Sequence, residues 1–75
     1  MSTYDRYLKS VRCNATALNV VKVNGKFRTY DHDAWFAADK CKKTAHLINR
    51  RRTVDLTGAD LITLHNQGKQ VVVVE

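Results

Sequence analysis

What the 75-residue sequence lacks narrows the kinds of protein that it can be. It has no run of about 18 apolar residues, so we expect no membrane-spanning helix and no membrane partner. The first ten residues, MSTYDRYLKS, contain no apolar signal core, and we therefore expect a cytoplasmic protein. Cysteine is scarce, and in a chain without an export signal Cys13 and Cys41 are expected to be reduced and buried rather than paired. Proline is absent altogether.

The patterns that mark common catalytic and metal sites are also missing. There is no CxxC or HxxxH spacing, no GxSxG, and no phosphate-cradling glycine loop. An aspartate–histidine pair can act as a base and its orienting partner, and Asp31, His32 and Asp33 stand together. They lie where a helix is expected to begin, however, and an aspartate that caps the first backbone N–H groups is the simpler interpretation. We expect no enzyme, no metal and no cofactor.

Acidic residues are absent from one stretch of the chain, between Lys40 and Arg52. That stretch holds six basic residues, and the remaining seven are balanced by the seven acidic residues of the chain. The whole net charge of +6 therefore comes from this segment. Bases at the end of a helix also complement its dipole, so a solvated, stabilising charge run is the alternative to a functional basic patch.

The segment that contains these charges predicts the longest helix, over residues 33–49. It holds four alanines and neither glycine nor proline, a composition that favours helix. At 100° per residue, one side of this helix carries a buried stripe of mostly small side chains. These are Ala34, Ala37, Ala38, Cys41, Ala45 and Ile48. Trp35 falls on a more polar side and is expected to pack against the first helix rather than to face solvent.

Shorter signals predict the other elements. Tyr4, Tyr7, Leu8 and Val11 have the spacing of one buried helix face, which predicts a helix over residues 3–13. Asn24-Gly25 is a strong signal for a two-residue turn, and it predicts a β-hairpin within residues 16–31. A strand is expected over residues 53–56 and a short helix follows Thr57, which with Asp60 resembles a capping box. Gly68 ends that helix, and the run QVVVV over residues 70–74 is typical of a strand buried on both faces.

These elements predict one small α+β domain over residues 1–75, in the order α-β-β-α-β-α-β. We expect a mixed sheet of about four strands, formed by the N-terminal hairpin and a C-terminal βαβ unit. In that unit the last strand would run parallel to the strand over residues 53–56 and next to it. The long alanine-faced helix would cover the sheet.

The basic helix and the arginine run indicate a nucleic-acid-associated module, either for DNA or for RNA, because clustered lysines and arginines are the electrostatic footprint of phosphate binding. An exposed aromatic side chain would add stacking on bases. The candidate binding residues are Lys40, Lys42, Lys43, Arg50, Arg51 and Arg52, with Lys26 and Arg28 on the hairpin and Trp35 on the helix.

The alternative is a protein-docking modulator or inhibitor that binds a larger acidic protein. In size, charge and lack of a catalytic motif, the chain resembles bacteriophage early proteins, which dock on larger machines. Such a protein would use an amphipathic face, here Phe36, Lys40, Lys43 and Leu47, or an exposed strand edge. The sequence alone indicates neither the oligomeric state nor which of the two partners is bound.

Overall fold

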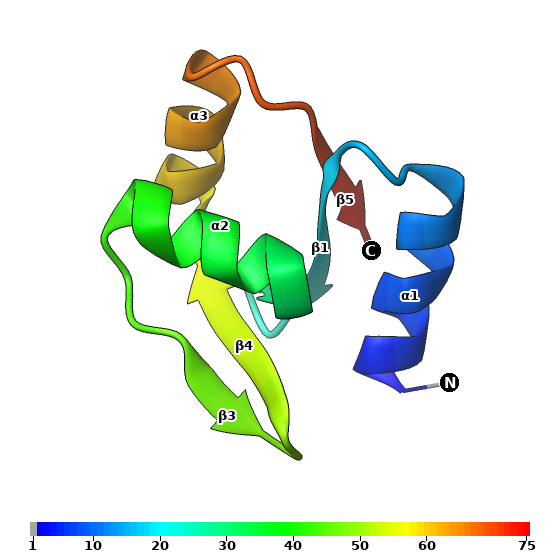
Figure 1. Cartoon of the computed structure of the whole chain (residues 1–75). Coiled ribbons are helices and arrows are strands. Elements are labelled where there is room, and N and C mark those ends of the chain that lie inside the picture. Colours follow the sequence, from blue (N-terminus) through cyan, green and yellow to red (C-terminus); the bar gives the residue numbers. More distant parts are fainter. Residues whose placement is uncertain (1) are drawn as a thin grey trace.

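The computed structural model describes residues 2–75, which have an α+β fold (Figure 1). Within these residues there are three helices and five strands. In chain order they are α1 (Thr3–Cys13), β1 (Leu18–Val23), β2 (Lys26–Tyr30), α2 (Asp31–Cys41), β3 (His46–Ile48), β4 (Arg51–Leu56), α3 (Gly58–Asn66) and β5 (Val71–Val74). None of the helices in this range is both long enough and apolar enough to cross a membrane.

The five strands form one mixed sheet in the order β3-β4-β2-β1-β5. The predicted hairpin is confirmed: β1 and β2 are antiparallel, and Val23 pairs with Lys26 across the Asn24-Gly25 turn. Both turn residues have positive φ, 50° and 80°, as a turn of this kind requires. β4 extends the sheet beyond β2 and β3 forms one edge, while β5 runs parallel to β1 at the other edge.

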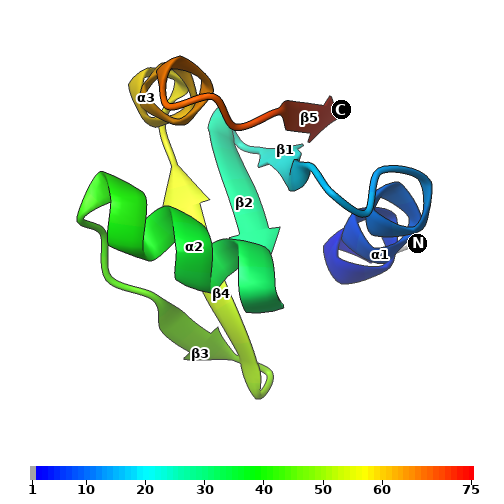
Figure 2. The same cartoon turned by 45° about the horizontal axis from the view of Figure 1, so that its top comes forward.

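Helices cover both faces of the sheet (Figure 2). α2 and α3 lie on one face, over a core that contains Leu18, Val20, Val54, Leu56 and Leu64. α1 lies on the other face, where Tyr7, Val21 and Tyr30 form a second buried cluster. The predicted short helix has its capping box, with the Thr57 hydroxyl accepting from the Asp60 N–H and the Asp60 carboxylate accepting from the Thr57 N–H. Gly68 follows α3 in the left-handed region, with φ of 87°.

The prediction of one helix over residues 33–49 is wrong, because α2 ends at Cys41. Lys42 adopts the left-handed conformation, with φ of 57°, and the N–H groups of Lys42 and Lys43 both bond to the Ala38 carbonyl. Residues 46–48 then pair with β4 as a strand. This pairing provides hydrogen-bond partners for the backbone N–H and C=O groups on the outer edge of β4. A longer helix would leave those groups without partners. Tertiary pairing thus overrides local helix propensity.

Because α2 ends at Cys41, only part of the predicted stripe of small residues is buried on this helix. Ala34 and Ala37 are fully buried, and Ala38, Cys41 and Ala45 pack against the core. Ile48 is 44% exposed and does not belong to the core. Cys13 is also exposed, contrary to expectation, and both cysteines are free.

The C-terminal strand has the expected direction but a different neighbour. β5 pairs with β1, Leu18 opposite Val71, so that β1 and β2 separate it from β4. The four valines are therefore half-buried residues of an edge strand rather than a strand covered on both faces, and Val73 is 41% exposed. A run of β-branched residues indicates a strand, but it does not indicate where in the sheet the strand lies.

Asp31 and Asp33 do not cap α2 as predicted, since the N-cap residue is Tyr30 and no side chain caps it. Asp31 accepts a 2.7 Å hydrogen bond from the Tyr4 hydroxyl. The Asp33 carboxylate accepts from the Tyr7 hydroxyl at 2.8 Å and from the Asn19 backbone N–H at 3.2 Å. The two carboxylates therefore attach α1 and β1 to the start of α2.

Candidate nucleic-acid interface

The arginine run forms the turn and first residues of a hairpin, β3–β4, whose tip projects beyond the helices (Figure 1). Asn49 and Arg50 are the two turn residues, with φ of 52° and 65°. Ile48 pairs with Arg51 and Leu47 pairs with Arg52. Because neighbouring residues of a strand point to opposite faces, Arg51 lies on the α1 side of the sheet and Arg52 on the α2 side. All three arginines are exposed.

Arg51 is positioned by Tyr4 of α1. Its guanidinium carbon lies 3.9 Å from the centre of the Tyr4 ring, and it donates a 2.9 Å hydrogen bond to the Tyr4 hydroxyl. The Tyr4 ring in turn meets the Tyr30 ring edge-on, with centroids 5.1 Å apart. Burial, followed by the hydrogen bond to Asp31, raises the pKa of the Tyr4 hydroxyl above its ordinary value. Arg51 therefore lies over an aromatic ring that is itself held on two sides.

Arg28 is not a free cation. Its Nε lies 2.8 Å from one oxygen of Asp55 and its guanidinium also donates to the other at 3.3 Å, so the pair is bidentate. The hydrogen bond from Arg28 is the largest cause of the lowered pKa of the Asp55 carboxyl. A phosphate would have to compete with Asp55 for this guanidinium, and Arg28 is accordingly the weakest of the predicted phosphate ligands.

The lysines at the end of α2 diverge. Lys43 pairs with Asp60 at 3.3 Å. Burial alone would raise the pKa of the Asp60 carboxyl, but hydrogen bonds from Thr57 and Lys43 hold it below its ordinary value. The Lys40 ammonium lies 5.7 Å from the centre of the Phe36 ring, which the Lys69 ammonium also approaches. Lys40, Lys42 and Lys43 therefore do not continue the arginine run along one helix face.

Two adjoining hollows lie on the α1 side of the sheet, over the strands that α1 leaves uncovered. The first, of about 310 Å³, lies between the start of α1 and the β3–β4 turn; its lining is Ser2, Thr3, Tyr4, Arg28, Tyr30, Ile48, Asn49 and Arg51. The second has a similar volume of about 310 Å³ and is lined by Lys26, Lys43, Thr44, His46, Ile48, Thr53 and Asp55. Ile48 lines both. The structure thus brings Lys26 and Lys43 together in one hollow, and Arg28 and Arg51 in the other.

Trp35 does not pack against α1 as predicted. It is 55% exposed on α2, and its indole stacks on the imidazole of His32, with centroids 6.1 Å apart and planes 22° apart. Trp35 lines neither of the two hollows beside the hairpin. It is an exposed aromatic side chain, as a stacking role requires, but it lies apart from these hollows.

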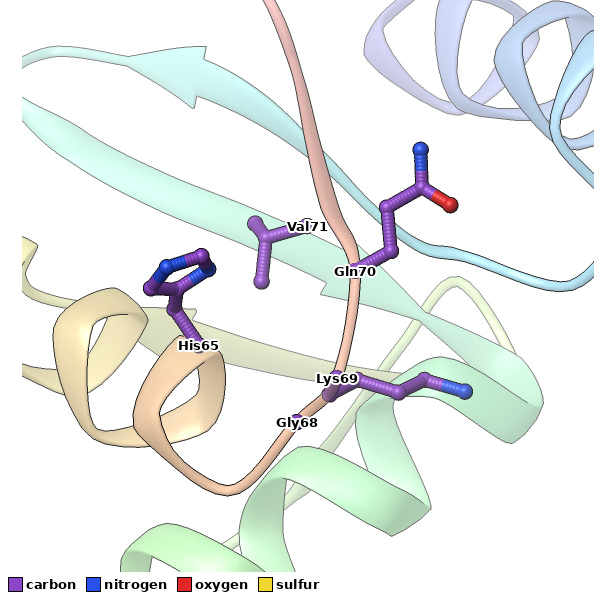
Figure 3. A pocket seen from close by; sticks show the side chains of 5 residues that line it. All are labelled: His65, Gly68, Lys69, Gln70 and Val71. Atoms are coloured by element: carbon purple, nitrogen blue, oxygen red, sulfur yellow. The ribbon is translucent and has the colours of Figure 1, made fainter.

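A further hollow, of about 370 Å³, lies where the chain leaves α3 and approaches β5 (Figure 3). His65 and Val71 face one another there, whereas Lys69 and Gln70 point away from them. Its lining also includes Gly68 and contains none of the predicted binding residues. With a single titratable side chain directed into it, this hollow offers no convergent set of polar groups.

The sequence did not indicate three residues that line the hollow around Arg51, namely Tyr4, Ile48 and Asn49. Tyr4 was assigned to a buried helix face and Ile48 to the core. The available signals were Asn49, which tolerates positive φ, and the alternation of exposed and buried residues along β4. Without a glycine after Asn49, the turn had none of the usual dipeptide signatures.

No protein-family model matches this sequence, and comparison with curated proteins finds no similar one.

Proposed function

We propose that this protein is a small nucleic-acid-associated module that binds the phosphate backbone through the β3–β4 hairpin. The observation that carries the proposal is the state of Arg50, Arg51 and Arg52. They are exposed on a projecting turn, and none of them takes part in an ion pair within residues 2–75. Three guanidiniums at adjacent positions, none paired with a carboxylate, suit phosphate oxygens, to which arginine donates in a planar, bidentate manner.

The charge balance of the remaining surface supports the same assignment. The ion pairs within the described residues are Lys22–Glu75, Arg28–Asp55 and Lys43–Asp60, and none of them includes a residue of the arginine run. Asp31 and Asp33 accept hydrogen bonds from tyrosines. Cations without an ion pair also lie on α1, but the hairpin is where three of them are adjacent in the sequence, with Lys40 and Lys42 at the end of α2 as additional contacts.

The test is the salt dependence of oligonucleotide binding. Three neutralised phosphates give a slope of log K against log salt of about −2 to −3. Replacing Arg50 and Arg52 by Gln should weaken binding and make this slope shallower. The matched control is Lys9→Gln with Arg12→Gln, which removes the same charge from exposed positions on α1. Equal losses in both double variants would mean that binding follows net charge alone, and the hairpin would then not be the interface.

A second candidate, docking on a larger acidic protein, is favoured by one observation. β3 is an edge strand, and its Leu47 is 76% exposed and its Ile48 44% exposed. An exposed strand edge with apolar side chains can accept a strand from a partner. Capture from a lysate with and without nuclease separates the two: nucleic-acid binding predicts partners that disappear with nuclease, and docking predicts one stoichiometric protein that remains. Leu47→Ser would weaken docking more than Arg52→Gln does.

A further inference from the structure

We infer that the hollow between the start of α1 and the β3–β4 turn receives one unpaired nucleobase, stacked on the guanidinium of Arg51. The inference rests on the proposed function and specifies its ligand, which is single-stranded rather than duplex nucleic acid. It concerns the first of the two hollows, which is lined by Tyr4, Arg51 and their neighbours.

The stacking surface is already formed. The Arg51 guanidinium carbon lies over the Tyr4 ring, 3.9 Å from its centre, and a hydrogen bond to the Tyr4 hydroxyl restrains the guanidinium. Tyr4 is held by the ring of Tyr30 and by the carboxylate of Asp31. A guanidinium held in this way presents a planar, weakly hydrated surface to the hollow, on which a base can stack. Little side-chain freedom remains to be lost when a base binds.

The other walls suit a neutral, planar and polar ligand better than an anion. The charge of Arg28 is already taken by Asp55, so the hollow lacks a second free cation from its own sheet face. Ile48 contributes an apolar wall, while the Thr3 hydroxyl and the Asn49 amide offer hydrogen bonds to the edge of a base. A volume of about 310 Å³ is at the small end of ligand pockets, consistent with one base rather than a larger group.

A phosphate attached to the bound base would lie near Arg50, which is in the adjoining turn. Arg52 is on the opposite face of β4 and does not line the hollow. A base inside a duplex would have to leave its stack to reach Arg51, which costs a few kcal/mol, whereas an unpaired base reaches it without that cost. We therefore expect this surface to discriminate between strands by their pairing and only weakly by their sequence.

The experiment measures the affinity of the full chain for three oligonucleotides of equal phosphate number, by fluorescence anisotropy. They are a single strand, a self-complementary duplex, and a single strand in which abasic residues replace the bases. Stacking on one base predicts that the single strand binds roughly 5- to 150-fold more tightly than the abasic strand. Equal affinities for these two strands would overturn the inference, and this arm needs no variant protein.

The matched variants are Arg51→Lys and Arg52→Lys, two neighbours on opposite faces of β4. Each keeps its charge and loses the planar group, but only Arg51 lies on Tyr4. Arg51→Lys should bring the single strand down to the affinity of the abasic strand and leave the salt slope unchanged, while Arg52→Lys should preserve the preference. Equal effects of both would overturn the inference and leave phosphate binding intact. If none of the three oligonucleotides binds, the proposed function itself is wrong.

Discussion

The Tyr7 hydroxyl donates a 2.8 Å hydrogen bond to the Asp33 carboxylate and thereby joins the middle of α1 to the first turn of α2. The same carboxylate accepts from the Asn19 N–H, at the second residue of β1. One acidic side chain therefore connects two helices and a strand. Tyr7 is 4% exposed, and its hydroxyl also lies 3.0 Å from the Tyr30 carbonyl oxygen, a second acceptor.

This contact predicts a large loss of stability when it is broken. Asp33→Ala should lower the free energy of unfolding by about 1.5–3 kcal/mol, the usual range for a hydrogen bond to a charged group. Denaturant titration of the single variants Asp33→Ala and Tyr7→Phe and of the double variant would measure it. The two losses should add only in part, because both variants remove the Tyr7–Asp33 bond, while Asp33→Ala also removes the bond from the Asn19 N–H. Full additivity would contradict a direct contribution from this pair.

Alkaline conditions should destabilise the protein through Tyr7. Burial, followed by the hydrogen bond to Asp33, raises the pKa of its hydroxyl above the ordinary value of 10.0. The stabilisation is therefore complete below pH 10 and is lost as the pH rises above that, because the unfolded state then releases a proton that the folded state keeps. Unfolding free energies measured on both sides of pH 10 should fall in the parent protein, and fall less steeply in Tyr7→Phe.

Acidic conditions should remove the contribution of the Arg28–Asp55 pair. The pKa of Asp55 is lowered in the folded state, so its stabilisation is present above the ordinary value of 3.8 and is lost as the pH falls through the lowered value. The pair is partly exposed, and we expect a contribution of about 0.2–1 kcal/mol. Asp55→Asn should therefore be less stable than the parent near neutral pH and equally stable once Asp55 is protonated. A pH-independent difference would assign the loss to packing.

The β3–β4 turn allows stability and binding to be separated at one residue. Arg50 has φ of 65°, a conformation that costs an L-residue roughly 1–2 kcal/mol and glycine almost nothing. Arg50→Gly should therefore raise the melting temperature or leave it unchanged, and at the same time weaken oligonucleotide binding. Thermal unfolding and binding assays on the same sample would show this. A lower melting temperature would mean that the Arg50 side chain stabilises the hairpin.

Substitutions at two nearby residues of α2 should differ in their effect on stability, because one residue is buried and the other is exposed. Ala37 is fully buried against the sheet, so Ala37→Leu should overpack the core at a cost of about 1–3 kcal/mol. Trp35 is exposed, so Trp35→Ala should change stability by less than about 0.5 kcal/mol. The emission of this single tryptophan should also be that of a solvated indole. A strongly blue-shifted emission would show that Trp35 is covered.

Elements with a complete local signal were predictable from the sequence. The Asn24-Gly25 turn indicated the first hairpin and its register, and the capping pair Thr57 and Asp60 indicated where α3 begins. The periodic apolar residues of α1 indicated its bounds. In each of these cases the deciding interactions lie within a few residues of one another, so a short window of sequence contains them.

The second hairpin was not predictable in this way, because the interactions that decide it involve residues far apart in the sequence. Residues 42–49 become a loop and a strand because β4 needs an outer neighbour, and β4 is itself positioned by β2. The same reason explains why the relative positions of the basic residues differ from those expected. A helix would have aligned Lys40 and Lys43, whereas the hairpin separates them from Arg50 and sets Arg51 on Tyr4.

The pairing of β5 with β1 has a consequence for the kinetics of folding. The two strands come from opposite ends of the chain, and parallel pairings over such sequence separation form slowly because a long loop must close first. Until β5 arrives, β1 presents an open edge to solvent and the run of four valines remains unpaired. We expect the last refolding step to be the docking of β5, and the yield of refolding to fall with rising protein concentration, because an unpaired valine strand of one molecule can occupy the vacant edge of another.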